Sequence, residues 1–194
     1  RLIVHEDLAD DFIEGLRVRA ERLNAGDPQD AEGGLGAMIG EQAAIRVKGL
    51  IDDAVARGAR LVAGGRRQGA RLDATILDLV TSSMRIYYEE SFGPVASIIR
   101  YGDVDEAVSI ANDTEYGLAA AVFGRDVTRA LDVARRLETG ICHINGSTIH
   151  DEPQMPFGGM KASGYGRFGG RAGIEEFTEL RWITIRSGRQ DYPV

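Results

Sequence analysis

The sequence predicts an α/β protein: a three-layer αβα domain with a mostly parallel, twisted sheet and a strand arm at its C-terminal end. Apolar segments at 95–101, 118–123 and 141–145 have the composition of buried strands. Two amphipathic segments, at 104–111 and 127–138, separate these strands and repeat their apolar residues at helical spacing. Strands that alternate with helices over short connections favour parallel pairing through right-handed crossovers, with helices on both faces of the sheet.

The residues before position 95 supply further parts of this domain. We expect Asp7 to cap the first helix and Gly58 to end the second, because these residue types are preferred at those positions. Asp103 followed by Glu106 predicts a capping box at the start of the helix at 104–111. The other expected elements are strands at 2–4, 60–63 and 72–80, helices at 7–23 and 41–57, and a loop rich in glycine and proline at 24–40.

Regular structure is expected to stop at Asn145 and to resume with a short helix at 173–177. Residues 146–173 contain eight glycines, and long connections of this kind in a compact domain are commonly functional. This loop leaves the carboxyl end of a predicted parallel strand, where α/β sheets place their ligands. The chain is thus expected to divide into a domain at 1–179 and an arm at 180–194, which contains a final strand at 181–186.

Composition and charge exclude several classes of protein. The 194 residues carry 30 acidic and 23 basic side chains, a net charge of -7, with no basic block, which argues against nucleic acid or an anionic membrane as a partner. The longest apolar run, at 118–123, is far too short to span a membrane. One cysteine excludes an intramolecular disulfide and a cysteine-built zinc site, and it fits a reducing cytoplasm. The three histidines lack the spacing of metal ligands, so we predict no metal site.

Three local patterns each allow a functional and a structural interpretation. Residues 164–169 have the glycine spacing of a dinucleotide fingerprint, yet they do not follow a strand directly, so a glycine-shaped contact surface is the better interpretation. Cys142 and His143 are neighbours on a predicted strand and point to opposite faces, which favours a buried cysteine over a nucleophile. Glu89 and Glu90 form either a solvated helix end or an acceptor for a ligand's diol.

Three longer motifs resemble the aldehyde dehydrogenase superfamily. They are EESFGPV at 89–95, ANDTEYGL at 111–118 and PFGGMKASGYGR at 156–167. They occur in the family's order and near its spacing, so the resemblance covers essentially the whole chain as the C-terminal, catalytic portion of that family. Residues 144–156 further resemble the branch that oxidises aromatic aldehydes such as benzaldehyde, vanillin and salicylaldehyde.

The resemblance implies roles for five residues of this chain. The second acid of the first motif, Glu90, corresponds to the family's ligand for the nicotinamide ribose hydroxyls, and Phe92 flanks the nicotinamide end. Phe157 of the third motif corresponds to a residue that lines the aldehyde tunnel, and Ile149 and His150 fall in the loop that shapes this tunnel. The implied cofactor is NAD or NADP, and the choice between them belongs to the missing domain.

The first residue, Arg1, leads directly into the predicted strand at 2–4, so we expect the chain to be a piece of a longer protein. The resemblance places the family's cysteine nucleophile shortly before Arg1, and its glutamate base, oxyanion asparagine and dinucleotide-binding domain further upstream. Cys142 holds a different position and does not inherit the nucleophile's role. In the family a thiolate adds to the aldehyde, hydride passes to NAD(P)+ and water hydrolyses the thioester. The chain alone is therefore expected to hold no catalytic residue and to be inactive.

The sequence leaves open both the substrate and the question of whether the protein is an enzyme. An enzyme of this kind would take a small-molecule aldehyde, work with the missing N-terminal domain and, through the strand at 181–186, form a homodimer or homotetramer. An aliphatic aldehyde or a semialdehyde is the alternative substrate. A different class is a non-catalytic α/β module for oligomerisation or binding, and a Gly-Gln-x-Cys segment upstream of Arg1 would distinguish the enzyme from it.

Overall fold

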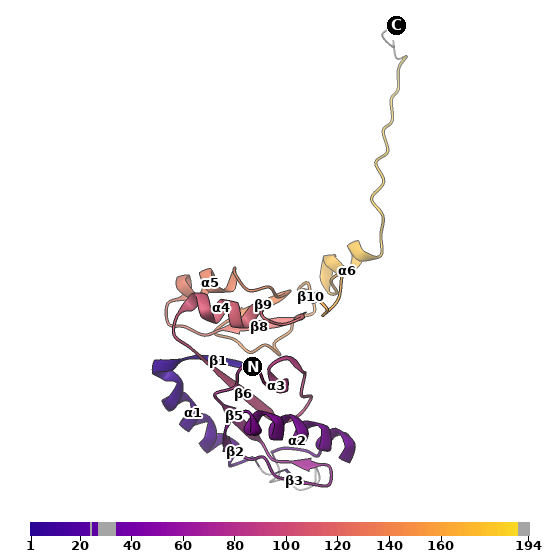
Figure 1. The fold of residues 1–194 in the computed structure, drawn as a ribbon. Helices are drawn as coiled ribbons and strands as arrows, with labels where there is room; N and C mark the ends of the chain where they lie inside the picture. The colour runs from indigo at the N-terminus through magenta and orange to yellow at the C-terminus, as the bar shows by residue number, and fades with distance from the viewer. Residues whose placement is uncertain (24, 27–33, 190–194) are drawn as a thin grey trace. The chain divides into compact units, whose positions relative to one another are not determined.

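The computed structural model describes residues 1–23, 25–26 and 34–189, and it has the predicted α/β fold class (Figure 1). The chain divides into two compact units. The first comprises Arg1–Glu115 with Arg135–Leu137, and the second comprises Tyr116–Ala134 with Glu138–Val194. The predicted loop at 24–40 lies partly outside the described residues.

A four-stranded, mostly parallel sheet forms the centre of the first unit. Its strands lie in the order β1 (Leu2–His5), β6 (Val95–Tyr101), β5 (Thr75–Asp78) and β2 (Arg60–Ala63). β6 runs parallel to both β1 and β5, with Leu2 opposite Ile98 and Thr75 opposite Val95. The edge strand β2 is antiparallel to β5. The bounds of β2 and β6 are those that the sequence predicts.

Helices cover both faces of this sheet, as a three-layer arrangement requires. α1 (Glu6–Ala20) buries Ile13 in an apolar cluster that includes Ile76 of β5. α2 (Glu41–Ala56) buries its apolar face in a second cluster, which includes the next strand residue, Leu77. Successive residues of a strand point to opposite faces, so the two clusters lie on the two sides of the sheet.

Side chains at the helix starts decide where the helices begin. α4 (Val104–Asn112) has the predicted capping box, because Oδ1 of Asp103 accepts a hydrogen bond from the N–H of Glu106 at 2.9 Å. The Glu106 carboxylate accepts in return from the backbone N–H just before the cap, at 2.8 Å. The predicted cap of α1 is wrong, because the N–H of Asp7 itself donates to Nδ1 of His5, and the helix begins one residue earlier.

The second unit contains a βαβ element and a short ladder. β8 (Ala119–Val122) and β9 (Ile141–Ile144) pair in parallel, and α5 (Val127–Ala134) lies between them along the chain, as the sequence predicts. β7 (Tyr116–Gly117) pairs antiparallel with β10 (Met160–Lys161). α6 (Gly170–Glu176) begins earlier than the helix predicted at 173–177.

One prediction about the sheet is wrong: the strands at 95–101, 118–123 and 141–145 do not form a single sheet. β6 lies between β1 and β5, so both of its edges are occupied, and β8 pairs with β9 in a separate sheet. A strand has only two edges, and the order of elements along the chain does not reveal which strand takes each edge.

The predicted strand at 72–80 divides into two elements. β4 (Arg71–Leu72) pairs with β3 (Arg67–Gln68) as a short hairpin, and β5 then starts at Thr75. A short helix, α3 (Arg85–Tyr88), follows where no element is predicted. The local pattern is too short in each of these pieces for periodicity to identify it.

The described part of the C-terminal arm forms no strand within this single chain. Residues 178–189 form neither helix nor strand, although a strand is predicted at 181–186 (Figure 1). The Trp182 and Ile185 side chains are 91% and 92% exposed. A strand exists only with a hydrogen-bonded neighbour, and the part of the chain that the structure describes provides none for this segment.

None of the described helices combines the length and the apolar character that crossing a bilayer requires. Histidine, cysteine, aspartate and glutamate side chains in the described ranges form no group of three or more that could hold a metal ion.

Candidate functional site

The first candidate site is the loop at residues 89–93, between α3 and β6 of the first unit. Glu90 is exposed on this loop, and the Phe92 side chain is 80% exposed. Phe92 has a φ of 44°, in the left-handed region that a bulky residue rarely adopts. A Cβ on Gly93 would lie 3.0 Å from Cγ2 of Val47, so the 89–93 loop packs closely against α2. Strained residues of this kind gather at functional sites.

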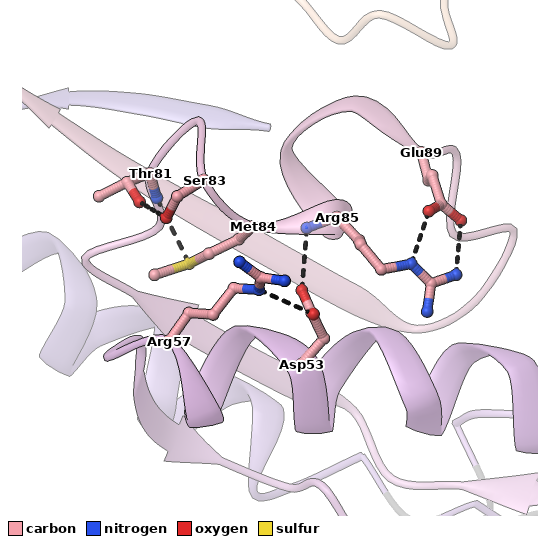
Figure 2. A network of polar contacts seen from close by, with 7 residues as sticks. All are labelled: Asp53, Arg57, Thr81, Ser83, Met84, Arg85 and Glu89. Atoms are coloured by element: carbon pink, nitrogen blue, oxygen red, sulfur yellow. Dashed lines mark hydrogen bonds and ion pairs between the residues drawn. The ribbon is translucent and has the colours of Figure 1, made fainter.

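A network of polar contacts holds the residues before this loop, as Figure 2 shows. The guanidinium of Arg85 binds both carboxylate oxygens of Glu89, at 2.7 and 3.0 Å, and this contact lowers the pKa of Glu89. The backbone N–H of Arg85 donates to Oδ2 of Asp53 at 2.9 Å, and Nε of Arg57 donates to Oδ1 at 2.8 Å. These two hydrogen bonds, that from Arg85 first, lower the pKa of Asp53. α2 thus anchors the start of α3.

The Glu90 carboxylate, unlike that of Glu89, has no partner among the described residues. No hydrogen bond or ion pair among the described residues reaches this group, whereas the backbone carbonyl of Glu90 accepts from Nη1 of Arg46 at 3.1 Å. An exposed carboxylate can accept hydrogen bonds from two neighbouring hydroxyls, as carboxylates do on a ribose. The residues present therefore fit the diol of a nucleotide.

The second candidate site lies in the second unit, in the glycine-rich region after β9. Ile149 is 89% exposed, and Nε2 of His150 lies 3.3 Å from the Glu152 carboxylate. The His150 ring meets His143 edge-on, with 5.8 Å between the ring centroids. Nε2 of His143 is buried and has no hydrogen-bond partner within the described ranges. Phe157, further along the chain, is 37% exposed. Ile149 and Phe157 therefore both offer apolar surface.

Close contact with neighbouring backbone explains several glycines of this region, among them Gly158, Gly169 and Gly170. Phe157 and Phe168 exchange two backbone hydrogen bonds, of 2.8 and 2.7 Å. A Cβ on Gly169 would lie 2.2 Å from the carbonyl oxygen of Met155. Backbone contact thus accounts for Gly169, whereas Gly164 and Gly166 have φ values of 110° and 71°, which glycine adopts readily.

Cys142 lies in β9, opposite Ala120 of β8. It is half-buried, and burial raises the pKa of its thiol above the usual value. A raised pKa disfavours the thiolate that a nucleophile requires. The structure therefore gives Cys142 the environment of a packed structural cysteine.

Sequence reasoning did not identify the residues that support the 89–93 loop. Arg85 and Glu89 are four residues apart, a spacing that predicts an ion pair once the short helix is known. Arg46 and Asp53 act on residues 44 and 32 positions away, so no local pattern reveals their contacts.

Known proteins match this chain over its whole length. Residues 1–183 match the aldehyde dehydrogenase family. A vanillin dehydrogenase from Pseudomonas fluorescens is 57% identical, over 100% of this chain and 40% of that protein. The crystal structure of a salicylaldehyde dehydrogenase from Pseudomonas putida G7, complexed with salicylaldehyde, matches with a TM-score of 0.93 at 50% identity, over 100% of this chain and 40% of that one. A Mycobacterium tuberculosis aldehyde dehydrogenase complexed with NAD+ matches with a TM-score of 0.88 at 34% identity, over 97% and 40%.

The chain spans 40% of the length of these relatives. The matched residues, 1–183, include the 89–93 loop and the glycine-rich region after β9, so the family match covers both candidate sites. This chain belongs to the aldehyde dehydrogenase family.

Proposed function

We propose that the complete protein is an NAD(P)-dependent aldehyde dehydrogenase and that this chain is its C-terminal part. The reaction oxidises an aldehyde to a carboxylic acid through a cysteine thioester, as the family resemblance implies. The observation that carries the proposal is the exposed Glu90 carboxylate, which has no partner among the described residues while Arg85 binds the neighbouring Glu89. The family match over residues 1–183 supports the same function.

In this proposal the chain binds and orients the cofactor and the aldehyde, and the missing upstream part supplies the group that reacts with the aldehyde carbonyl. Glu90 accepts hydrogen bonds from the nicotinamide ribose, and Phe92 packs at the nicotinamide end. When bound, the dinucleotide supplies hydride acceptance. NAD and NADP both fit, because they share the same nicotinamide ribose. The 194-residue chain alone is inactive in this proposal, and the complete protein works in the cytoplasm, which suits a chain with one cysteine.

The test of this function is the Glu90→Gln variant of the complete protein. An amide is a weaker hydrogen-bond acceptor than a carboxylate, so we expect cofactor binding to weaken by about 1–3 kcal/mol. Isothermal titration with NAD+ and with NADP+ measures the effect. Glu89→Gln is the matched control with the smaller expected effect, since Arg85 already occupies the Glu89 carboxylate. Unchanged cofactor affinity in Glu90→Gln would refute the assignment.

The proposed substrate is an aromatic aldehyde. Ile149, Phe157 and Met155 have exposed fractions of 89%, 37% and 56% and offer an apolar wall. Residues 145–160 contain no arginine or lysine that could pair with a substrate carboxylate. The names of the relatives, vanillin and salicylaldehyde dehydrogenase, support the same substrate class.

Steady-state kinetics of the complete protein check this substrate class. We expect kcat/KM for benzaldehyde to exceed that for acetaldehyde and succinic semialdehyde by about tenfold or more, because apolar contact favours the ring and no cation receives the carboxylate. Preference for the semialdehyde would instead point to a cation in the upstream part of the protein and would overturn the aromatic assignment.

Residues 180–194 are proposed as the assembly arm of a homodimer or homotetramer, beside a catalytic portion at 1–179. The exposed apolar side chains of Trp182 and Ile185 and the absence of a partner strand for this segment in the described ranges support an intermolecular role. Deletion of 180–194 from the complete protein is expected to lower the oligomeric state, as analytical ultracentrifugation measures. An assembly that survives the deletion would show that another surface forms the interface.

A further inference from the structure

The Arg46 side chain donates hydrogen bonds to the backbone of the 89–93 loop. No motif identified in the sequence includes this residue. We propose that Arg46 is a positioning residue, which holds the backbone of this loop in the geometry that the cofactor requires. This inference rests on the proposed function, because it takes Glu90 and Phe92 as the residues that meet the nicotinamide ribose.

The contacts of Arg46 are directional. Nη1 donates to the carbonyl oxygen of Glu90 at 3.1 Å, and Nη2 donates to that of Ser91 at 2.6 Å. The guanidinium is planar, so two donors that bind consecutive carbonyls fix the orientation of both peptide planes. The direction of the Glu90 side chain and the path of the chain into Phe92 follow from those planes.

The loop requires such support because its conformation is unfavourable. Phe92 has a φ of 44°, and its side chain is 80% exposed, so packing of the ring does not hold the backbone there. A strained residue persists only where its surroundings determine its conformation. On one side of Phe92 these surroundings are the Arg46 hydrogen bonds, and on the other is the contact of Gly93 with Val47. Both supports come from consecutive residues of α2.

The choice of acceptors also suits a binding role. Arg46 binds carbonyl oxygens and leaves the Glu90 carboxylate without a partner among the described residues, whereas Arg85 takes the Glu89 carboxylate. An arginine that bound the Glu90 carboxylate would compete with the ligand's hydroxyls. Arg46 therefore orders the loop and keeps the acceptor available.

The experiment compares Arg46→Met and Arg46→Lys with Arg67→Met in the complete protein. Arg67 is the matched control, because its side chain also makes two hydrogen bonds, to Glu41 at 2.9 Å and to the Gly69 carbonyl at 2.7 Å, away from the 89–93 loop. Isothermal titration gives the Kd for NAD+ and NADP+, steady-state kinetics gives KM for cofactor and for benzaldehyde, and thermal unfolding gives Tm.

We expect Arg46→Met to raise the cofactor Kd and KM about tenfold and to change the benzaldehyde KM less than about twofold. Arg46→Lys keeps the charge but lacks the planar fork, so it should recover part of the loss. The Tm shifts of Arg46→Met and Arg67→Met should be similar. If Arg46 had a purely structural role, Arg46→Met would lower Tm and would not raise the cofactor KM more than the benzaldehyde KM. If Arg46→Met does not fold, the comparison of Arg46→Lys with Arg67→Met decides.

The inference is overturned if the cofactor Kd of the Arg46 variants stays within about twofold of that of Arg67→Met. Glu90→Gln in the same titration separates this failure from a failure of the proposed function. A loss in Glu90→Gln without a loss in Arg46→Met refutes positioning alone. A loss in Arg46→Met without one in Glu90→Gln supports positioning of the loop and refutes the role of the Glu90 carboxylate.

Discussion

Asp78→Asn is expected to destabilise the complete protein by about 2–3 kcal/mol, because it removes a buried carboxylate that accepts charge-assisted hydrogen bonds from two arginines. The Asp78 side chain is fully buried in β5. Its carboxylate accepts from Nε and Nη2 of Arg100, at 3.1 and 2.9 Å, and from Nη2 of Arg60, at 2.7 Å. Urea unfolding measures the loss in the free energy of unfolding, and the dependence of that free energy on urea concentration is compared between the variants.

Asp10→Asn is the matched control for this prediction. Asp10 binds Nη2 of the same Arg100 at 2.7 Å, but its side chain is 82% exposed. An exposed ion pair contributes little, so we expect a loss below about 1 kcal/mol. Equal losses of stability in the Asp10 and Asp78 variants would show that burial does not increase the contribution of Asp78 to the free energy of unfolding.

The same carboxylate gives a pH dependence with a defined sign. Burial alone would raise the pKa of Asp78, but the hydrogen bonds from Arg100, from the N–H of Leu79 and from Arg60 outweigh it, and the pKa lies below the usual 3.8. A depressed pKa in the folded state stabilises the protein above pH 3.8, and this contribution disappears as the pH falls through the folded-state pKa. The difference in stability between wild type and Asp78→Asn should therefore shrink below pH 3.8.

Gly140→Ala is expected to lower the stability of the complete protein and to disturb the proposed aldehyde site. A Cβ at Gly140 would lie 1.9 Å from the carbonyl oxygen of Gly158 and 2.8 Å from its carbonyl carbon. Both atoms belong to the backbone, so the segment that carries Phe157 must move. Such overpacking costs about 1–3 kcal/mol, and displacement of the Phe157 segment should lower kcat/KM for benzaldehyde about tenfold.

Gly173→Ala is the control for this substitution in the same unit. Gly173 lies within α6, and a Cβ there meets no heavy atom within 4 Å. Alanine has the higher helix propensity, so this variant should be neutral or more stable by up to about 1 kcal/mol. Thermal unfolding and benzaldehyde kinetics of the two variants test the prediction together. Wild-type kinetics in Gly140→Ala would contradict it.

Periodic segments were predictable from the sequence, because each carries its own pattern. β6 has the predicted bounds, and α4 has the predicted capping box at Asp103 and Glu106. The partition of the strands between two sheets was not predictable, since it depends on which strand takes each edge of β6. The start of α1 at Glu6 depends on the ring nitrogen of His5, which accepts the capping hydrogen bond, and histidine is not among the residues preferred at this position.

The candidate sites show the same division between local and distant information. Glu90 and Phe92 could be named from the motif at 89–95, because the motif is continuous in sequence. The support that Arg46 gives to the backbone of Glu90 and Ser91 could not be predicted, because these two partners lie 44 and 45 positions away. Sequence therefore identifies candidate ligand-binding residues more readily than the residues that hold them in place.

The pairing of β1 with β6 constrains how this protein folds during synthesis. Leu2 lies opposite Ile98, so 96 positions separate the two partners. At ordinary elongation rates the ribosome needs roughly 5–20 s to add that length of chain. During this interval β1 and the apolar face of α1 have no central strand to cover them, and the nascent chain exposes a hydrophobic segment to chaperones and to aggregation. The central sheet of the first unit thus cannot form until β6 has been synthesised.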